Sequence, residues 1–204
     1  MAVAKGSSRQ DSPAIPGPEE LAGDDASVRG WKKGGRGESR LAAHIHRELG
    51  VVLALHDRLI PGTRAANIDH LFIVSSGVWV VDAKTYEGTI ERRKRGPWWR
   101  GESDLYVGRR NRTNLADQMN LQIVAVKAAL KQDDQLDSVL VYPALCFVDT
   151  KWPRFLAPFD VRGVNVVSPR ALRRYLEQRG PLSQETLERA AHVLAKALPA
   201  AHRD

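Results

Sequence analysis

One segment constrains the fold of this chain more than any other: the sequence VWVVDAK, within a strand predicted at 78–85. Apolar side chains stand on both faces of this strand, which is typical of a central strand that is covered on both sides. A second apolar strand is predicted at 67–74, and the Ser-Ser-Gly sequence at 75–77 predicts a turn between the two. The sequence therefore predicts adjacent hairpin strands inside a layered fold.

Periodicity predicts the remaining elements. Apolar residues at helical spacing, with Gly50 as a stop, predict a first helix at 36–49, and a second long helix is predicted at 115–131. The other predicted elements are strands at 51–60, 139–148 and 161–167, and helices at 169–179 and 183–198. This order predicts an α/β fold with a mixed sheet flanked by helices, a largely antiparallel first half and extra C-terminal helices.

The chain has 204 residues, enough for one domain with a substantial core. Residues 1–30 contain several Pro and Gly residues and no apolar period, so we expect a flexible N-terminal tail there. We expect a single domain at 31–204, with its core at about 34–150 and a C-terminal strand and helices at 160–200.

Composition excludes several classes of protein. No stretch approaches the roughly 20 apolar residues that cross a bilayer, and the first residues lack the apolar segment of a secretory signal. The single cysteine, Cys146, cannot form an internal disulfide, and its apolar surroundings predict a buried small hydrophobe. We expect a cytoplasmic protein with no membrane partner.

An excess of Arg (22) over Lys (9) suggests a bacterial source with a GC-rich genome.

Charge is concentrated in one segment. The whole chain has 31 basic and 24 acidic residues. Residues 86–112 contain eight basic and only four acidic residues. Because a basic surplus suits a polyanion, this segment predicts contacts with nucleic acid, with aromatic side chains that could stack on bases. The predicted contact residues are Arg92, Arg93, Lys94, Arg95, Trp98, Trp99, Arg100, Arg109, Arg110 and Arg112. The alternative is a solvated hairpin whose tryptophans cover the sheet.

Four charged residues stand in phase with apolar ones. Glu38 shares the apolar stripe of the first helix, Asp69 alternates with the apolar residues of its strand, and Asp82 and Lys84 do the same on the next strand. Each has a structural alternative: a charge at a helix N-terminus for Glu38, a turn cap or ion pair for Asp69, and a simple ion pair for Asp82 with Lys84. Their coincidence favours a functional cluster, since buried charges are costly unless paired or bound to metal.

Such a cluster suits metal-assisted hydrolysis of phosphodiester bonds. Carboxylate oxygens are hard ligands that suit Mg²⁺ or Mn²⁺. A nearby lysine can orient the attacking water and stabilise the developing negative charge. The Asp-x-Lys spacing of Asp82 and Lys84 places both side chains on one side of a strand.

Several segments together resemble the nuclease-related domain (NERD) family. These are GGRGE at 34–38, NIDHLFIV at 67–74, GVWVVDAK at 77–84 with the following Tyr86 and Gly88, and NLADQ at 114–118. The resemblance covers about residues 34–130. It implies a place in the PD-(D/E)xK nuclease superfamily and a restriction-endonuclease-like αβββαβ core.

The resemblance also implies roles for individual residues. It implies five catalytic residues: Glu38, Asp69, Asp82, Lys84 and Gln118. Asp69 matches the first acidic motif at the end of the second strand, and Asp82 with Lys84 matches the (D/E)xK motif, in which many members carry Glu. Metal ligation would fall to Asp69, Asp82, Glu38 and the carbonyl oxygen of Ala83. Lys84 would position water, and Gln118 would contact metal-bound water or the phosphate.

These observations favour a hydrolase: a divalent-metal-dependent nuclease that acts on DNA. Two alternatives remain open at this point, a module on the same fold that binds nucleic acid without cutting it, and a protein-interaction or dimerisation module. The protein partners that we consider are a second copy of the chain, in a homodimer, and a helicase-type protein. The sequence contains no nucleotide-binding motor motif, so any ATP-driven unwinding of nucleic acid would need such a helicase.

Overall fold

A computed structural model describes residues 41–43, 45, 53–63, 66–96 and 102–201. The tail predicted at 1–30 lies outside these residues, and so do most of the first predicted helix, Trp98, Trp99 and Arg100. All described residues belong to one compact unit of the chain, at 33–204. No helix among them is long and apolar enough to cross a membrane.

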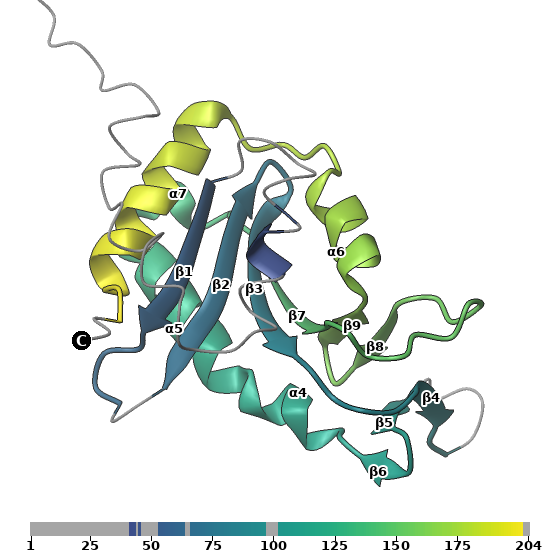
Figure 1. The fold of residues 1–204 in the computed structure, drawn as a ribbon. Helices are drawn as coiled ribbons and strands as arrows, with labels where there is room; N and C mark the ends of the chain where they lie inside the picture. Colours follow the sequence, from purple (N-terminus) through teal and green to yellow (C-terminus); the bar gives the residue numbers. More distant parts are fainter. Residues whose placement is uncertain (1–40, 44, 46–52, 64–65, 97–101, 202–204) are drawn as a thin grey trace, which may run out of the picture. The chain divides into compact units, whose positions relative to one another are not determined.

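The larger sheet has six strands in the order β1-β2-β3-β7-β9-β8 (Figure 1). They are β1 (Leu53–Leu59), β2 (Asn67–Val74), β3 (Gly77–Lys84), β7 (Val141–Phe147), β8 (Phe159–Val161) and β9 (Val164–Val167). The first three strands pair antiparallel, whereas β3 pairs parallel with β7 and β7 with β9. The sheet is therefore mixed, with β3 inside it, as its doubly apolar sequence predicts.

The basic segment forms a second, smaller antiparallel sheet that follows β3 in the chain (Figure 1). Its strands are β4 (Ile90–Lys94), β5 (Ser103–Val107) and β6 (Arg110–Asn111). The backbone N–H of Ile90 donates to the carbonyl of Lys151 at 2.9 Å, and Thr89 forms a parallel bridge with Lys151. These bonds hold the small sheet against the segment that follows β7.

Helices cover both faces of the large sheet. They are α4 (Asn114–Gln118), α5 (Asn120–Leu130), α6 (Pro169–Leu176) and α7 (Gln184–Ala197). On one face, residues of α5 and α7 such as Val126 and Leu194 share a core with Leu71 and Val80. On the other face, α6 packs with the helical residues Leu41 and Ile45 against alternate side chains of the same strands. This architecture is a mixed α/β fold consistent with the restriction-endonuclease-like core that the family resemblance implies.

Two predicted elements are divided in the structure. The helix expected at 115–131 is two helices that meet at Met119. The strand expected at 161–167 is the hairpin β8–β9, whose turn residues Arg162 (φ 54°) and Gly163 (φ 80°) both have left-handed backbones. Positive φ at two successive residues reverses the chain within two residues, which a continuous strand does not allow.

The two C-terminal helices begin at the caps that the sequence predicts. The hydroxyl oxygen of Ser168 accepts a hydrogen bond from the backbone N–H of Ala171 at 3.3 Å, with Pro169 as the first helical residue. The hydroxyl oxygen of Ser183 accepts one from the N–H of Thr186 at 3.2 Å. Each cap satisfies one of the backbone donors that a helix leaves unpaired at its start.

We predict that Gly77→Ala destabilises the protein far more than Gly62→Ala, a matched control. Both glycines have positive φ, but a Cβ at Gly77 would lie 2.5 Å from the carbonyl oxygen of Leu140, whereas a Cβ at Gly62 meets no atom within 4 Å. We expect a loss of more than about 2 kcal/mol for Gly77→Ala and about 1 kcal/mol for Gly62→Ala in urea unfolding. Equal losses would contradict the packing of Gly77 against Leu140.

We predict that the thiol of Cys146 does not react in the folded protein. Cys146 is fully buried, as predicted, and burial raises the pKa of its thiol far above the usual value. Because the thiolate is the reactive form, Ellman's reagent at pH 8 should label Cys146 only after unfolding in guanidinium chloride. Rapid labelling of the native protein would contradict this burial.

Candidate active site

Asp69 and Asp82 meet at one end of the central hairpin. Asp69 is the third residue of β2, near the beginning of that strand rather than at its end, which corrects the position expected from the resemblance. His70 pairs with Val81 in the antiparallel register of β2 and β3. The residue before His70, Asp69, therefore lies beside the residue after Val81, Asp82. Directly opposed residues share a face of the sheet, and the two carboxylates are therefore neighbours.

The carboxylate of Asp69 reaches across to β3. Its Oδ2 accepts a hydrogen bond from the backbone N–H of Ala83 at 3.1 Å. Both aspartates are largely buried, with 8% of Asp69 and 5% of Asp82 exposed to solvent. A buried carboxylate needs hydrogen bonds or opposite charge, so this contact and the neighbouring lysine make the arrangement tolerable.

Lys84 forms an ion pair with Asp82. Its Nζ lies 2.6 Å from Oδ1 of Asp82, as the two-residue spacing on one strand face predicts. Partial burial lowers the pKa of Lys84, but the charge of Asp82, the close contact with its carboxylate and the charge of Asp69 together raise the pKa above the usual 10.5. Lys84 is therefore cationic at neutral pH, which suits orientation of water and stabilisation of negative charge rather than a general-base role.

The described part of the cluster has more negative than positive charge, since two carboxylates face one ammonium group. Its donor atoms are carboxylate oxygens, which fit a hard divalent cation. Within the described residues, however, no group of three or more His, Cys, Asp or Glu side chains lies close enough to hold a metal ion. The third predicted carboxylate, Glu38, lies outside these residues, so its part in the cluster stays a prediction.

The structure leaves two further predictions open. Gln118 is exposed at the end of α4, and its contact with metal-bound water or phosphate stays a prediction. The Ala83 backbone contributes its N–H to Asp69, while ligation by its carbonyl oxygen stays a prediction. His70, next to Asp69, is buried, and its Nδ1 lies 2.9 Å from Nδ1 of His56 on the neighbouring strand.

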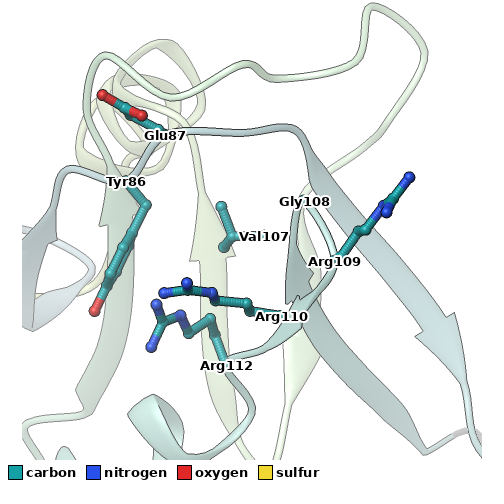
Figure 2. A pocket seen from close by; sticks show the side chains of 7 residues that line it. All are labelled: Tyr86, Glu87, Val107, Gly108, Arg109, Arg110 and Arg112. Carbon is teal, nitrogen blue, oxygen red and sulfur yellow. The ribbon is translucent and has the colours of Figure 1, made fainter.

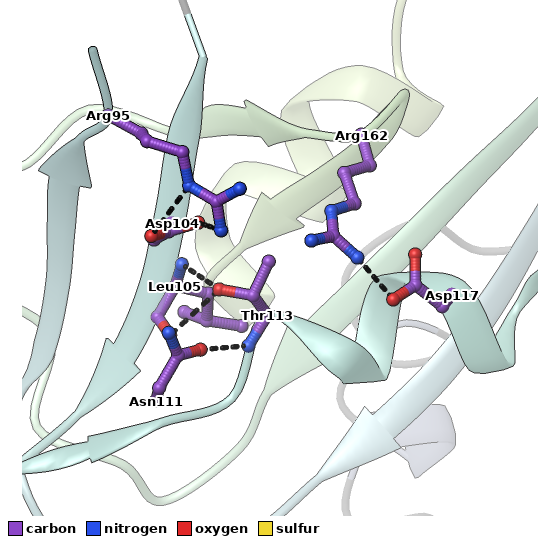
Figure 3. A network of polar contacts seen from close by, with 7 residues as sticks. All are labelled: Arg95, Asp104, Leu105, Asn111, Thr113, Asp117 and Arg162. Carbon is purple, nitrogen blue, oxygen red and sulfur yellow. Dashed lines mark hydrogen bonds and ion pairs between the residues drawn. The ribbon is translucent and has the colours of Figure 1, made fainter.

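The basic side chains of β4, and of Arg95 directly after it, largely have partners within the small sheet. Arg93 makes two hydrogen bonds to one carboxylate oxygen of Glu91, at 2.8 and 3.1 Å, and its guanidinium lies 3.8 Å from the centre of the Tyr106 ring. Arg95 pairs with Asp104 at 3.1 Å (Figure 3). The side chain of Arg92 donates to the hydroxyl of Ser103 at 2.8 Å. Lys94 is exposed.

Arg109, Arg110 and Arg112 differ from these arginines because they are among the residues that line a pocket of about 380 Å³ (Figure 2). Its walls come from residues 86–87, directly after β3, and from residues 107–112 of the β5–β6 region. The guanidinium of Arg112 lies 4.6 Å from the centre of the Tyr86 ring. The sequence predicted these arginines as contact residues but gave no sign that they form a pocket with Tyr86.

A polar network connects β5 and β6 to α4 (Figure 3). The buried hydroxyl oxygen of Thr113 accepts a hydrogen bond from the N–H of Leu105 at 3.0 Å, and the N–H of Thr113 donates to the side chain of Asn111 at 2.8 Å. Arg162 in the β8–β9 turn forms an ion pair with Asp117. These contacts fix the pocket segment between the small sheet and α4, and the sequence showed none of them.

The family model described as nuclease-related domain matches residues 33–148, more than half of the chain. The protein therefore belongs to the nuclease-related domain family, which is placed in the PD-(D/E)xK superfamily. No curated protein and no solved structure matches the chain.

We predict that the stabilising effect of Lys84 disappears at high pH. Its pKa is higher in the folded than in the unfolded chain, so its contribution is fully present below pH 10.5 and is lost as pH rises through the folded pKa. Lys84→Met should therefore lower the free energy of unfolding at pH 8, and the gap to the wild type should narrow above pH 10.5. Urea unfolding at several pH values measures this gap.

The control for this series is Lys127→Met, which changes an exposed lysine of α5. It removes the same charge without disturbing the cluster, so we expect little change in stability at any pH. A gap for Lys84→Met that stays constant across the pH series would contradict the ion pair.

Proposed function

We propose that the protein is a divalent-metal-dependent nuclease that hydrolyses phosphodiester bonds of DNA. The observation that carries the proposal is the adjacent, buried pair Asp69 and Asp82 with Lys84 on the same face of the central strand. A binding protein gains nothing from two carboxylates directed towards a polyanion, whereas a phosphodiesterase needs them for its cation. Membership of the nuclease-related domain family supports the same class of function.

Asp69 and Asp82 would hold Mg²⁺ or Mn²⁺, with Glu38 and the carbonyl oxygen of Ala83 as further proposed ligands. When bound, such a cation neutralises charge on the phosphate and makes a bound water more acidic. The backbone N–H of Ala83 keeps the Asp69 carboxylate turned towards β3, so that it faces the same space as Asp82.

Lys84 would supply the fixed positive charge of the reaction. Because it is cationic, it can donate hydrogen bonds to the attacking water and to a phosphate oxygen as negative charge develops there. Its contact with Asp82 positions the ammonium group before substrate arrives, which lowers the reorganisation that the reaction requires. Gln118 is proposed to contact the phosphate or its water.

Positive charge beyond the cluster supports a nucleic acid as substrate. Residues 86–112 follow β3 and carry a basic surplus, and three arginines of this segment, Arg109, Arg110 and Arg112, line the pocket beside Tyr86. Nucleic acid that crosses this segment would have phosphates near basic groups while one phosphodiester reaches Lys84. Trp98, Trp99 and Arg100 remain proposed contacts of the same segment.

We predict that Asp82→Asn abolishes cleavage of DNA. The change keeps the size of the side chain but removes the negative charge that would hold the cation, so the rate with Mg²⁺ or Mn²⁺ should fall by at least about 1000-fold. The measurement compares circular and linear DNA, single- and double-stranded, with each metal and with EDTA.

The matched control is Asp137→Asn, which neutralises an exposed aspartate beyond the candidate site and should leave the rate unchanged. Cleavage by Asp82→Asn at the wild-type rate would contradict the assignment. DNA binding that is weakened by salt, with no product under any metal, would instead support the binding module on the same fold.

A further inference from the structure

The pocket beside Tyr86 contains cationic groups that are directed inward. Figure 2 shows the guanidinium groups of Arg110 and Arg112 reaching towards Tyr86, whereas Arg109 points away. Glu87 is the acidic residue of the wall, and its carboxylate is turned away from both guanidinium groups in the same view. The interior therefore offers two positive charges that Glu87 does not neutralise by contact.

The two inward arginines have unused hydrogen-bond donors. Nε of Arg112 is buried and has no hydrogen-bond partner among the described residues. Within the same residues, no hydrogen bond or ion pair involves the side chain of Arg110. Among the described residues, the guanidinium of Arg112 likewise has no hydrogen bond or ion pair, so its terminal nitrogens can donate to a ligand in the pocket.

Two arginines in and directly after β4 provide a contrast within the same basic segment. Arg93 and Arg95 already pair with Glu91 and Asp104, so a new ligand must compete with those carboxylates. Because Arg110 and Arg112 face no such competition, they can form new charge-assisted hydrogen bonds at lower cost.

The pocket also lies beside the candidate active site. Tyr86 follows Lys84 by two residues, and the rings of Tyr86 and Phe147 are 6.2 Å apart. Phe147 in turn pairs with Lys84 in the parallel register of β3 and β7. A group held in the pocket is therefore held close to the end of β3 that carries Asp82 and Lys84.

We propose that this pocket binds one phosphate group of a nucleic-acid strand, with Arg110 and Arg112 as its donors, and so sets which phosphodiester reaches Lys84. The inference rests on the proposed nuclease function for its role in cleavage, but the binding itself does not require cleavage. A guanidinium fork matches phosphate oxygens, and the apolar side chain of Val107 with the ring of Tyr86 gives the attached sugar a nonpolar wall.

The volume is at the lower end of the range for small-molecule sites, which suits one phosphate with its sugar rather than a longer segment. The phosphate could be a terminal monoester or an internal diester. Both sources share the chemistry of the site, and the experiment separates them.

The experiment measures binding of a short single-stranded DNA with an internal fluorophore, by anisotropy, in EDTA so that no cleavage occurs. It compares the wild type with Arg110→Gln and with the double variant Arg110→Gln, Arg112→Gln. The control is the double variant Arg170→Gln, Arg174→Gln, which changes two exposed arginines of α6, outside the basic segment, and has the same net charge as the pocket double variant.

We expect the pocket double variant to bind the DNA at least about tenfold more weakly than the wild type. The slope of the logarithm of the binding constant against the logarithm of the salt concentration should become shallower by about 0.7, the value for one lost phosphate contact. Arg110→Gln alone should show part of this loss, and because Arg110 is exposed on β6, this variant tests the site even if Arg112 is needed for folding. The control should lose less than about threefold. Equal losses in the pocket and control variants, or no loss in either, would overturn the proposal.

A second set of titrations identifies the source of the phosphate, with strands that carry phosphate or hydroxyl at each end and with circular single strands. A preference for one phosphorylated end, lost in the pocket variants, assigns a terminal phosphate. An equal loss on all strands assigns an internal one. Binding is measured in EDTA and cleavage in a separate assay with Mg²⁺ or Mn²⁺, so failure of the nuclease and failure of the phosphate site give different results.

Discussion

The antiparallel register of β2 and β3 is the constraint on which the candidate site depends. Pairing of His70 with Val81 brings Asp69, at the beginning of one strand, beside Asp82, at the end of the other. A slip of one residue would turn one carboxylate to the opposite face, where the aromatic and apolar side chains of the second core lie. The apolar residues of both strands hold this register, so the core that stabilises the fold also holds the two acids together.

Strand pairing in the small sheet separates the arginines of the basic segment into two groups, those paired with carboxylates and those that face the pocket. The register of β4 and β5 places Asp104 opposite Arg93, and the carboxylate of Asp104 forms an ion pair with the nearby Arg95. Arg110 and Arg112 follow the turn after β5 and are left facing Tyr86. Surface charge alone would treat these arginines as equivalent, whereas their contacts separate those that hold the small sheet together from those available to a ligand.

Much of the fold was predictable because side-chain periodicity has a direct physical meaning. Alternation with period two placed Asp82 and Lys84 on one face, and the ion pair confirms it. The hairpin turn at Arg162 and the pocket around Tyr86 were not predictable. An arginine with positive φ carries no local sequence signal, and the contact of Tyr86 with Arg112 joins residues far apart in the chain. Such features depend on tertiary packing, which overrides local propensity.

Direct binding of a divalent cation tests whether Asp69 and Asp82 together form a metal site at the end of β3. The measurement is titration of Mn²⁺ into the protein without DNA, followed by electron paramagnetic resonance of the free ion. We expect saturable binding that is lost in the double variant Asp69→Asn, Asp82→Asn and kept in Asp137→Asn, since the latter changes only an exposed carboxylate. Equal Mn²⁺ affinity in the double variant and the wild type would contradict it.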